Sequence, residues 1–194
     1  TILSVKHWEN KELRKLKART VFRGNDICDE NNNLAVLQEA KVNPSGLAGI
    51  NANLAYGCLK GHATTQSDVI RAYTQFLKHQ GSNRVELPNE LVPPEFQGIK
   101  RPCARLWKSL NGHPEAGYRW DQRFKEMMRE IGSVHCPDTF QSTYFMKDTG
   151  LLLTLYVDDM VLRGQQINTN LFGIGQKTIE IEDPTPVDRI LGKM

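Results

Sequence analysis

The sequence has few cysteines, and none of them has the spacing typical of a metal site. The chain of 194 residues contains four cysteines that lie far apart: Cys28, Cys58, Cys103 and Cys136. No CxxC pair and no Cys-His zinc pattern occurs. These absences exclude the common zinc-binding patterns and favour an intracellular protein with reduced thiols.

Long apolar runs and a secretory leader are also missing. No hydrophobic stretch approaches the roughly 20 residues that a membrane-spanning helix needs. We therefore expect a protein that makes no membrane contact. The length favours one domain or two small subdomains.

Net charge is only +3, but the charge is distributed unevenly. Lysine and arginine dominate the N-terminal arm, whereas residues 179–188 are acidic. Within the arm, Lys15, Lys17 and Arg19 alternate with apolar residues, which predicts a strand with a cationic face. Two interpretations are open. The lysines protect a solvated edge strand from aggregation, or the row of cations binds a triphosphate.

The most informative stretch is Leu151–Gly164, LLLTLYVDDMVLRG. Its two apolar halves predict a hairpin with Asp158 and Asp159 at the turn. No glycine is present to relieve that turn, and the adjacent carboxylates repel unless a cation lies between them. The pair is either a solvated surface turn or part of a site for a divalent ion such as Mg²⁺, which needs a further carboxylate.

Asp68 is the candidate for that carboxylate. The residues from Ala63 predict a strand that runs into Asp68, and Arg71–Leu77 predicts a helix after it. An aspartate where a strand turns into a helix is well placed to face a cleft. The alternative is an N-cap of the following helix.

The remaining segments predict a scaffold of alternating helices and strands. We expect a helix from Asn43–Ser45 onward, a short strand at Val85–Leu87 with a proline-rich loop, a long helix after Pro114 whose core face carries Trp120, Phe124, Met127, Met128 and Ile131, a strand at Phe140–Met146, a short helix or turn at Asn170–Lys177, and a strand at Thr178–Asp183.

Several of these motifs resemble one known family. The segments Asp68–Tyr73 (DVIRAY) and Tyr156–Asp159 (YVDD) resemble motifs A and C of a reverse transcriptase. Four further segments occur in the matching order: Leu16–Asp26, Glu86–Phe96, Lys108–Trp120 and Glu182–Gly192. Together they resemble the copia-type reverse transcriptase of LTR retrotransposons over nearly the whole chain.

The resemblance implies an α+β fold, the palm of a right-hand polymerase with an antiparallel sheet backed by helices and a small fingers subdomain. The fingers would comprise residues 1–62 and 78–112, and the palm residues 63–77 and 113–194. It also implies a piece of a longer Pol polyprotein whose partner domains are the thumb, RNase H and integrase. With the thumb absent from this piece, we expect weak duplex binding and poor processivity.

The implied activity is RNA-directed DNA synthesis in the cytoplasm, within a virus-like particle, or in the nucleus. Asp68, Asp158 and Asp159 would hold two Mg²⁺ or Mn²⁺ ions, and deoxynucleotides would be added to a primer 3′-hydroxyl on an RNA or DNA template. The nucleotide-binding residues implied by the resemblance are Lys15, Lys17, Arg19, Arg71, Ala72, Tyr73 and Gly112. Tyr73 matches the family's steric gate against a ribose 2′-hydroxyl.

The sequence departs from the family pattern at Asn111, where a tyrosine is usual. One alternative is therefore an inactive or domesticated nucleic-acid-binding remnant of a reverse transcriptase. A different two-metal enzyme, such as a nuclease or cyclase, is disfavoured because Tyr73 and the basic strand would then have no role.

Overall fold

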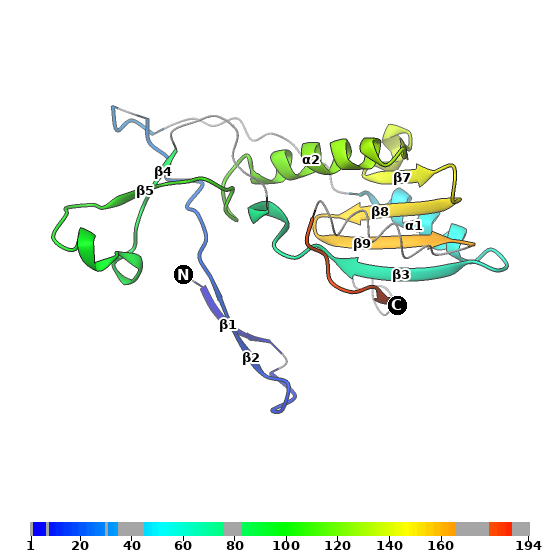
Figure 1. The fold of residues 1–194 in the computed structure, drawn as a ribbon, viewed down its shortest axis with the longest axis horizontal. Coiled ribbons are helices and arrows are strands. Elements are labelled where there is room, and N and C mark those ends of the chain that lie inside the picture. The colour runs from blue at the N-terminus through cyan, green and yellow to red at the C-terminus, as the bar shows by residue number, and fades with distance from the viewer. Residues whose placement is uncertain are drawn as a thin grey trace. The chain divides into compact units, whose positions relative to one another are not determined.

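The computed structural model describes residues 2–6, 8–29, 31–34, 45–75, 83–165 and 179–187. The chain divides into two compact units, and each is built from two separate stretches. Unit 1 comprises Thr1–Glu39 and Phe76–Ala116, and unit 2 comprises Ala40–Gln75 and Gly117–Met194. Figure 1 shows the elements of both.

Unit 2 is built on a six-stranded antiparallel sheet with the order β10-β3-β9-β8-β7-β6. The strands are β3 (Ala63–Asp68), β6 (Val134–His135), β7 (Thr143–Met146), β8 (Leu151–Tyr156), β9 (Asp159–Gly164) and β10 (Thr185–Pro186). β3 and β9 pair along their whole length although they are distant in sequence (Figure 1). The predicted strand into Asp68 and the apolar hairpin are confirmed. The strand predicted at Phe140–Met146 is shorter, because Phe140 lies in a 3-10 turn, Asp138–Phe140, before β7 begins.

Two helices cover opposite faces of this sheet. α1 (Leu47–Gly57) packs against β8 and β9, and α2 (Ala116–Glu130) packs on the other side. Thr143 and Tyr144 of β7 show which helix covers which face, because successive side chains of a strand point to opposite faces of the sheet. A Cβ atom at Gly49 of α1 would lie 2.9 Å from the Thr143 hydroxyl, whereas the Tyr144 ring contacts Phe124 of α2 with centroids 5.6 Å apart.

Coverage of both faces explains the unbroken apolar run in β8. All residues from Leu151 to Leu155 are buried. A strand with one wet face would alternate apolar and polar residues, whereas a strand covered on both faces has no polar side. The one polar member of the run, Thr154, accepts a hydrogen bond of 2.9 Å from the amide of Asn53 on α1.

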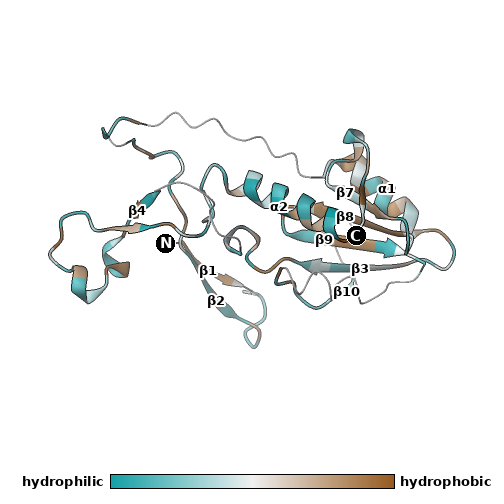
Figure 2. Ribbon diagram, turned by 45° about the horizontal axis from the view of Figure 1, so that its top comes forward, coloured by the Kyte–Doolittle hydropathy of each residue, from teal (hydrophilic) through white to brown (hydrophobic). Residues whose placement is uncertain are grey.

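The predicted apolar face of α2 is confirmed as core for four of its five residues, whereas Ile131 lies just beyond the end of the helix and is half-buried. Trp120, Phe124, Met127 and Met128 are each at most 5% exposed. Figure 2 shows hydrophobic and hydrophilic residues on different sides of this helix. The spacing of these residues therefore predicts which face of α2 packs against the sheet.

One expectation for unit 2 is corrected by its structure. The strand predicted at Thr178–Asp183 is not a continuous strand in its described part, where Ile181 forms an isolated bridge with Val69 and β10 follows. Pro184 removes a backbone donor from this stretch, which limits its pairing with β3. Residues 40–62, which the resemblance assigns to the fingers, lie in unit 2, where α1 packs against β8 and β9, and the fingers assignment stays a prediction. The turn predicted at Asn170–Lys177 lies outside the described residues.

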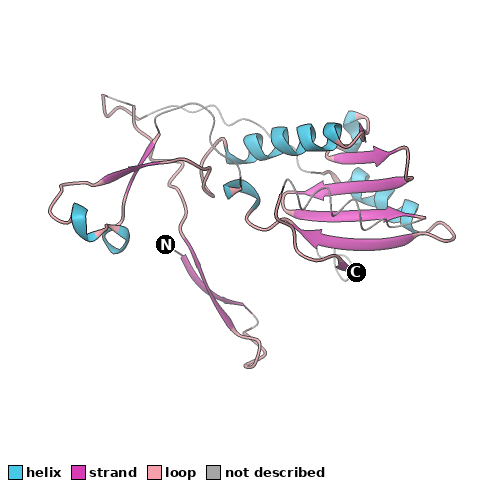
Figure 3. Ribbon diagram, viewed as in Figure 1, coloured by secondary structure: helices cyan, strands magenta, loops and turns pink. Residues whose placement is uncertain are grey.

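Unit 1 contains two separate antiparallel pairs, drawn as strands in Figure 3. β1 (Ile2–Lys6) pairs with β2 (Lys15–Arg19), and β4 (Arg84–Glu86) pairs with β5 (Cys103–Arg105). The basic strand and the strand around Val85 are thus confirmed, whereas β1 was not predicted. The proline-rich segment forms short 3-10 turns at Asn89–Leu91 and Pro94–Phe96.

The structure also bears on the expectations about cysteine and membranes. All four cysteines are free thiols. Within the described residues, neither α1 nor α2 has the length and apolar composition that crossing a bilayer requires.

Candidate metal and nucleotide site

Three carboxyl groups meet at one end of the unit 2 sheet. Asp68 is the last residue of β3, and it pairs in register with Asp159, the first residue of β9. Asp158 directly precedes this pair, and its carbonyl accepts a hydrogen bond of 2.8 Å from the Val69 N–H. All three aspartates are exposed. The structure thus brings together the residues that the sequence nominated from two distant segments.

The turn between β8 and β9 differs from the prediction by one residue. Tyr156 pairs with Asp159, so the two turn residues are Val157 and Asp158 rather than the two aspartates. Val157 takes the positive φ, at 60°. A β-branched residue in this region is an outlier that costs on the order of 1–3 kcal/mol. The absence of glycine therefore strains Val157, and Asp159 is free to sit on the strand beside Asp68.

Two hydrogen bonds hold the strained turn from different elements. The indole N–H of Trp120, on α2, donates to the Val157 carbonyl at 2.7 Å. The Val69 N–H, just beyond β3, donates to the next carbonyl, that of Asp158. Trp120 is only 3% exposed, so its hydrogen bond is shielded from competing water.

The crowding of acids is visible in the electrostatics of Asp159. Its pKa is raised to about 6, first by burial and then by the charges of Asp68 and Asp158, with a further contribution from a hydrogen bond to Asp68. A divalent cation would offset the repulsion among these charges, and carboxylate oxygens are the kind of ligand that Mg²⁺ and Mn²⁺ take.

The carboxylates are not arranged as a closed metal cage. Among the described residues, no three His, Cys, Asp or Glu side chains form a group ready to hold an ion. Magnesium usually keeps water or substrate phosphate among its ligands and relies on few carboxylates. Metal binding at this site accordingly remains a prediction.

The alternative role of Asp68 as a helix N-cap is not supported. The segment after β3 forms a 3-10 turn, Ala72–Thr74, rather than the longer helix expected from Arg71 onward. Its N-cap residue is Arg71, and no side chain caps it. Asp68 is therefore available to the cluster of acids.

Tyr73 lies close to the carboxylates. It is partly buried, and its pKa is raised by burial and then by the charge of Asp158. The neighbouring Ala72 is 4% exposed. The short turn thus buries Ala72 in the unit and presents the Tyr73 side chain on the side of Asp158.

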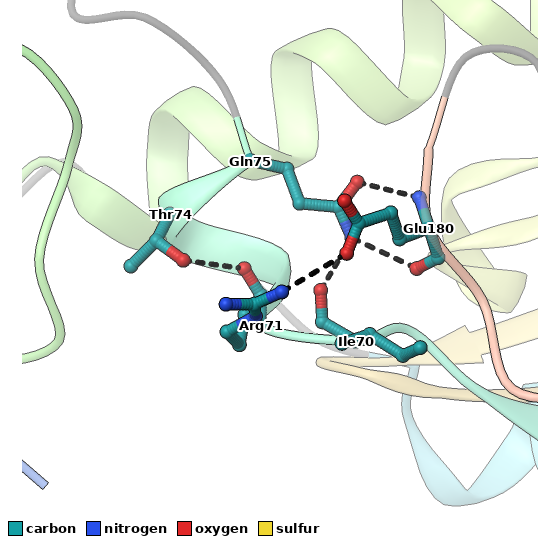
Figure 4. Close-up of polar contacts among 5 residues, drawn as sticks. All are labelled: Ile70, Arg71, Thr74, Gln75 and Glu180. Atoms are coloured by element: carbon teal, nitrogen blue, oxygen red, sulfur yellow. Dashed lines mark hydrogen bonds and ion pairs between the residues drawn. The ribbon is translucent and has the colours of Figure 1, made fainter.

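Arg71 and two residues that the sequence did not nominate form a clamp beside Tyr73 (Figure 4). Arg71 has φ of 52° and pairs with Glu180 at 3.2 Å, with both side chains well exposed. Gln75 donates to the carbonyls of Ile70 and Glu180, the latter at 2.8 Å, and accepts from the Glu180 N–H at 2.7 Å. The clamp fastens the segment around Glu180 to the end of β3.

The other nominated residues belong to unit 1. Lys15, Lys17 and Arg19 alternate along β2, so they share one face of that strand. Lys15 and Arg19 are exposed and Lys17 is half-buried. Gly112 has φ of 88°, and a Cβ atom there would lie 2.2 Å from the Phe22 carbonyl oxygen, so only glycine fits.

Sequence patterns signalled some of the supporting residues only partially. The apolar spacing of α2 identified Trp120 as core but not as a donor to Val157. A buried tryptophan needs a partner for its N–H, and that rule is the signal that could have found it. Gln75 and Glu180 carry no comparable local signal, because their contact joins segments far apart in sequence.

Among known proteins, the chain is similar to the retrovirus-related Pol polyprotein from transposon TNT 1-94 of Nicotiana tabacum, with 29% identity over 109 residues. The alignment covers 50% of this chain and 8% of that polyprotein, so the chain spans a small part of its relative. No family model and no solved structure matches the chain. The similarity supports an origin in a retrotransposon Pol polyprotein.

Proposed function

We propose that this chain is the catalytic core of an RNA-directed DNA polymerase that uses Asp68, Asp158 and Asp159 as ligands for two divalent ions. The observation that carries the proposal is the register pairing of Asp68 with Asp159 next to Asp158. Burial, and then the charges of Asp68 and Asp158, raise the pKa of Asp159, so the three acids at this sheet end repel one another when all are ionised. Such an arrangement is stabilised by binding cations.

The metal ions would supply Lewis acidity at the primer 3′-hydroxyl and at the triphosphate. The residues of this chain would then have separate tasks. The carboxylates hold the ions, and Tyr73 limits the space beside the sugar of the incoming nucleotide. Lys15, Lys17 and Arg19 offer a row of positive charge suited to triphosphate or template phosphates.

The similarity to a Pol polyprotein agrees with this proposal at the level of the parent polyprotein. The partners in the proposed reaction are a primer annealed to an RNA or DNA template and deoxynucleoside triphosphates. The thumb, RNase H and integrase segments of a polyprotein would act alongside the chain. We place the palm in unit 2 and the fingers in unit 1.

Primer extension on an RNA template with Mg²⁺ tests the proposal. We expect Asp158→Asn or Asp159→Asn to reduce extension by at least about a hundredfold, the effect of removing a group that stabilises developing charge. Asp148→Asn is the matched control, because Asp148 is exposed in the turn that precedes the other end of β8. Equal extension by all three variants would refute the assignment.

A nucleic-acid-binding remnant would behave differently in the same assay. It would bind the primer–template with an affinity that falls steeply as salt rises, yet it would incorporate no nucleotide when fused to a thumb segment. Loss of incorporation only in the site variants separates the polymerase from this remnant.

A further inference from the structure

The turn that carries Asp158 is anchored to the core through one side chain. Trp120 lies on α2, and its indole N–H donates to the carbonyl of Val157 at 2.7 Å. The indole is 3% exposed and its ring packs against Phe124, with centroids 5.4 Å apart. The donor is therefore fixed in position by the core before any ligand arrives.

The accepting residue is the strained one. Val157 has φ of 60°, which a β-branched residue seldom adopts unless its surroundings impose it. Relaxation of Val157 to negative φ would rotate the peptide that leads into Asp158. Because Asp159 follows at once and pairs with Asp68, that rotation would move one carboxylate relative to the other two.

From this geometry we infer that Trp120 is a positioning residue, which holds Val157 at positive φ and thereby fixes the spacing of Asp158 from Asp68 and Asp159 for metal binding. Trp120 touches neither metal nor nucleotide in this scheme. Groups that orient metal ligands commonly change metal affinity or activity by about 10- to 100-fold when removed. The inference rests on the proposed function for its activity readout.

The test removes the indole donor with the least change in shape. Trp120 is replaced by benzothienylalanine, in which sulfur takes the place of the N–H, and in a second variant by phenylalanine. Phe124→Leu is the control for core damage, because Phe124 is equally buried in α2 and has a ring contact with Trp120. Thermal unfolding of each variant reports the loss of stability.

The main measurement is the Mg²⁺ concentration that gives half-maximal primer extension. We expect it to rise about tenfold or more in both Trp120 variants and to stay unchanged in Phe124→Leu at comparable loss of stability. Equal metal requirements in wild type and the benzothienylalanine variant would overturn the inference.

Substitution of Val157 by glycine provides the decisive comparison. Glycine adopts positive φ without steric cost, so Val157→Gly should restore a near wild-type metal requirement in the Trp120→Phe background. A purely structural role for Trp120 predicts no rescue, and absence of rescue would overturn the inference.

A readout independent of activity separates this inference from the proposed function. The chain has three tryptophans, and Trp8 and Trp107 are 63% and 64% exposed. We expect one indole N–H to exchange slowly with solvent and its resonance to broaden on Mn²⁺ titration, and Mn²⁺ to bind more weakly in the benzothienylalanine variant. If wild type extends no primer yet shows this pattern, the polymerase proposal fails and the positioning role stands. Unaltered Mn²⁺ affinity overturns the positioning role.

Discussion

Replacing Asp159 with asparagine should stabilise the metal-free protein while abolishing the proposed primer extension. Asp159 is a charged group held beside two other acids, and its pKa is raised to about 6. Asparagine has the shape of the protonated acid, and its amide can donate a hydrogen bond to Asp68 as that acid does. The substitution therefore removes repulsion without removing the contact.

The magnitude follows from the pKa. The rise from 3.8 to about 6 is roughly 2 pKa units, which corresponds to about 3 kcal/mol at 1.36 kcal/mol per unit. Asp159 is more than a third exposed, and solvent screening reduces this figure to about 1 kcal/mol. For a chain of this length, such a gain raises the melting temperature by roughly 2–4 °C.

The stability difference between Asp159→Asn and wild type depends on pH in a definite direction. Because the folded state binds the Asp159 proton more tightly than the unfolded state, wild type loses stability as pH rises from about 4 to about 6. The advantage of Asp159→Asn should thus be small at pH 4 and reach its plateau above pH 6. In the presence of Mg²⁺, wild type should become more stable than Asp159→Asn, since the ion stabilises wild type more than the variant.

Thermal unfolding across this pH range, with and without Mg²⁺, measures the effect. Asp148→Asn carries the same charge change at an exposed turn before β8 and serves as the control for the loss of one carboxylate outside the site. If Asp159→Asn lowers the melting temperature without metal at pH 7, the carboxylates do not repel in the folded state. The case for a cation at this site would then fail.

Three further outcomes are expected. Tyr73→Ala should admit ribonucleotides at least about tenfold better relative to deoxynucleotides, whereas Tyr73→Phe should not, as measured by competitive incorporation. Gly112→Ala should destabilise the protein by more than about 1 kcal/mol in urea unfolding, because the new Cβ would meet the Phe22 carbonyl at 2.2 Å. Asn53→Ala should cost about 1–3 kcal/mol in the same assay, since it removes the 2.9 Å hydrogen bond that the Asn53 amide donates to the buried Thr154 hydroxyl.

Elements that depend on the spacing of residues close together in the sequence could be predicted from that sequence. The apolar run of β8 and the one-sided spacing of α2 each arise from burial over a few residues, and each was confirmed. The basic strand was also confirmed as β2, but burial does not explain its alternation, because its apolar Leu16 is 90% exposed. The pairing of Asp68 with Asp159 needed a resemblance to a known family, because no local rule connects two segments so far apart.

The details that the sequence left open concern single-residue choices. Whether Val157 or Asp159 enters the turn depends on the register of β8 against β9, and both choices keep the apolar pattern. β1 has no strong pattern of its own and is a strand because β2 lies beside it. The clamp at Glu180 likewise depends on where a distant segment crosses the end of β3.

The buried polar contacts of unit 2 have a consequence for the alignment of its strands. Apolar residues of β8 and β9 can slide past one another at little cost when both faces are covered, so hydrophobicity alone would leave their pairing ambiguous. The Asn53 amide bonds and the hydrogen bond of 3.1 Å from buried Arg163 to the Leu54 carbonyl are satisfied only in one alignment. Conservative changes deep under α1 are therefore expected to let β9 shift by one residue, which leaves Asp68 and Asp159 in the sequence but no longer opposite each other.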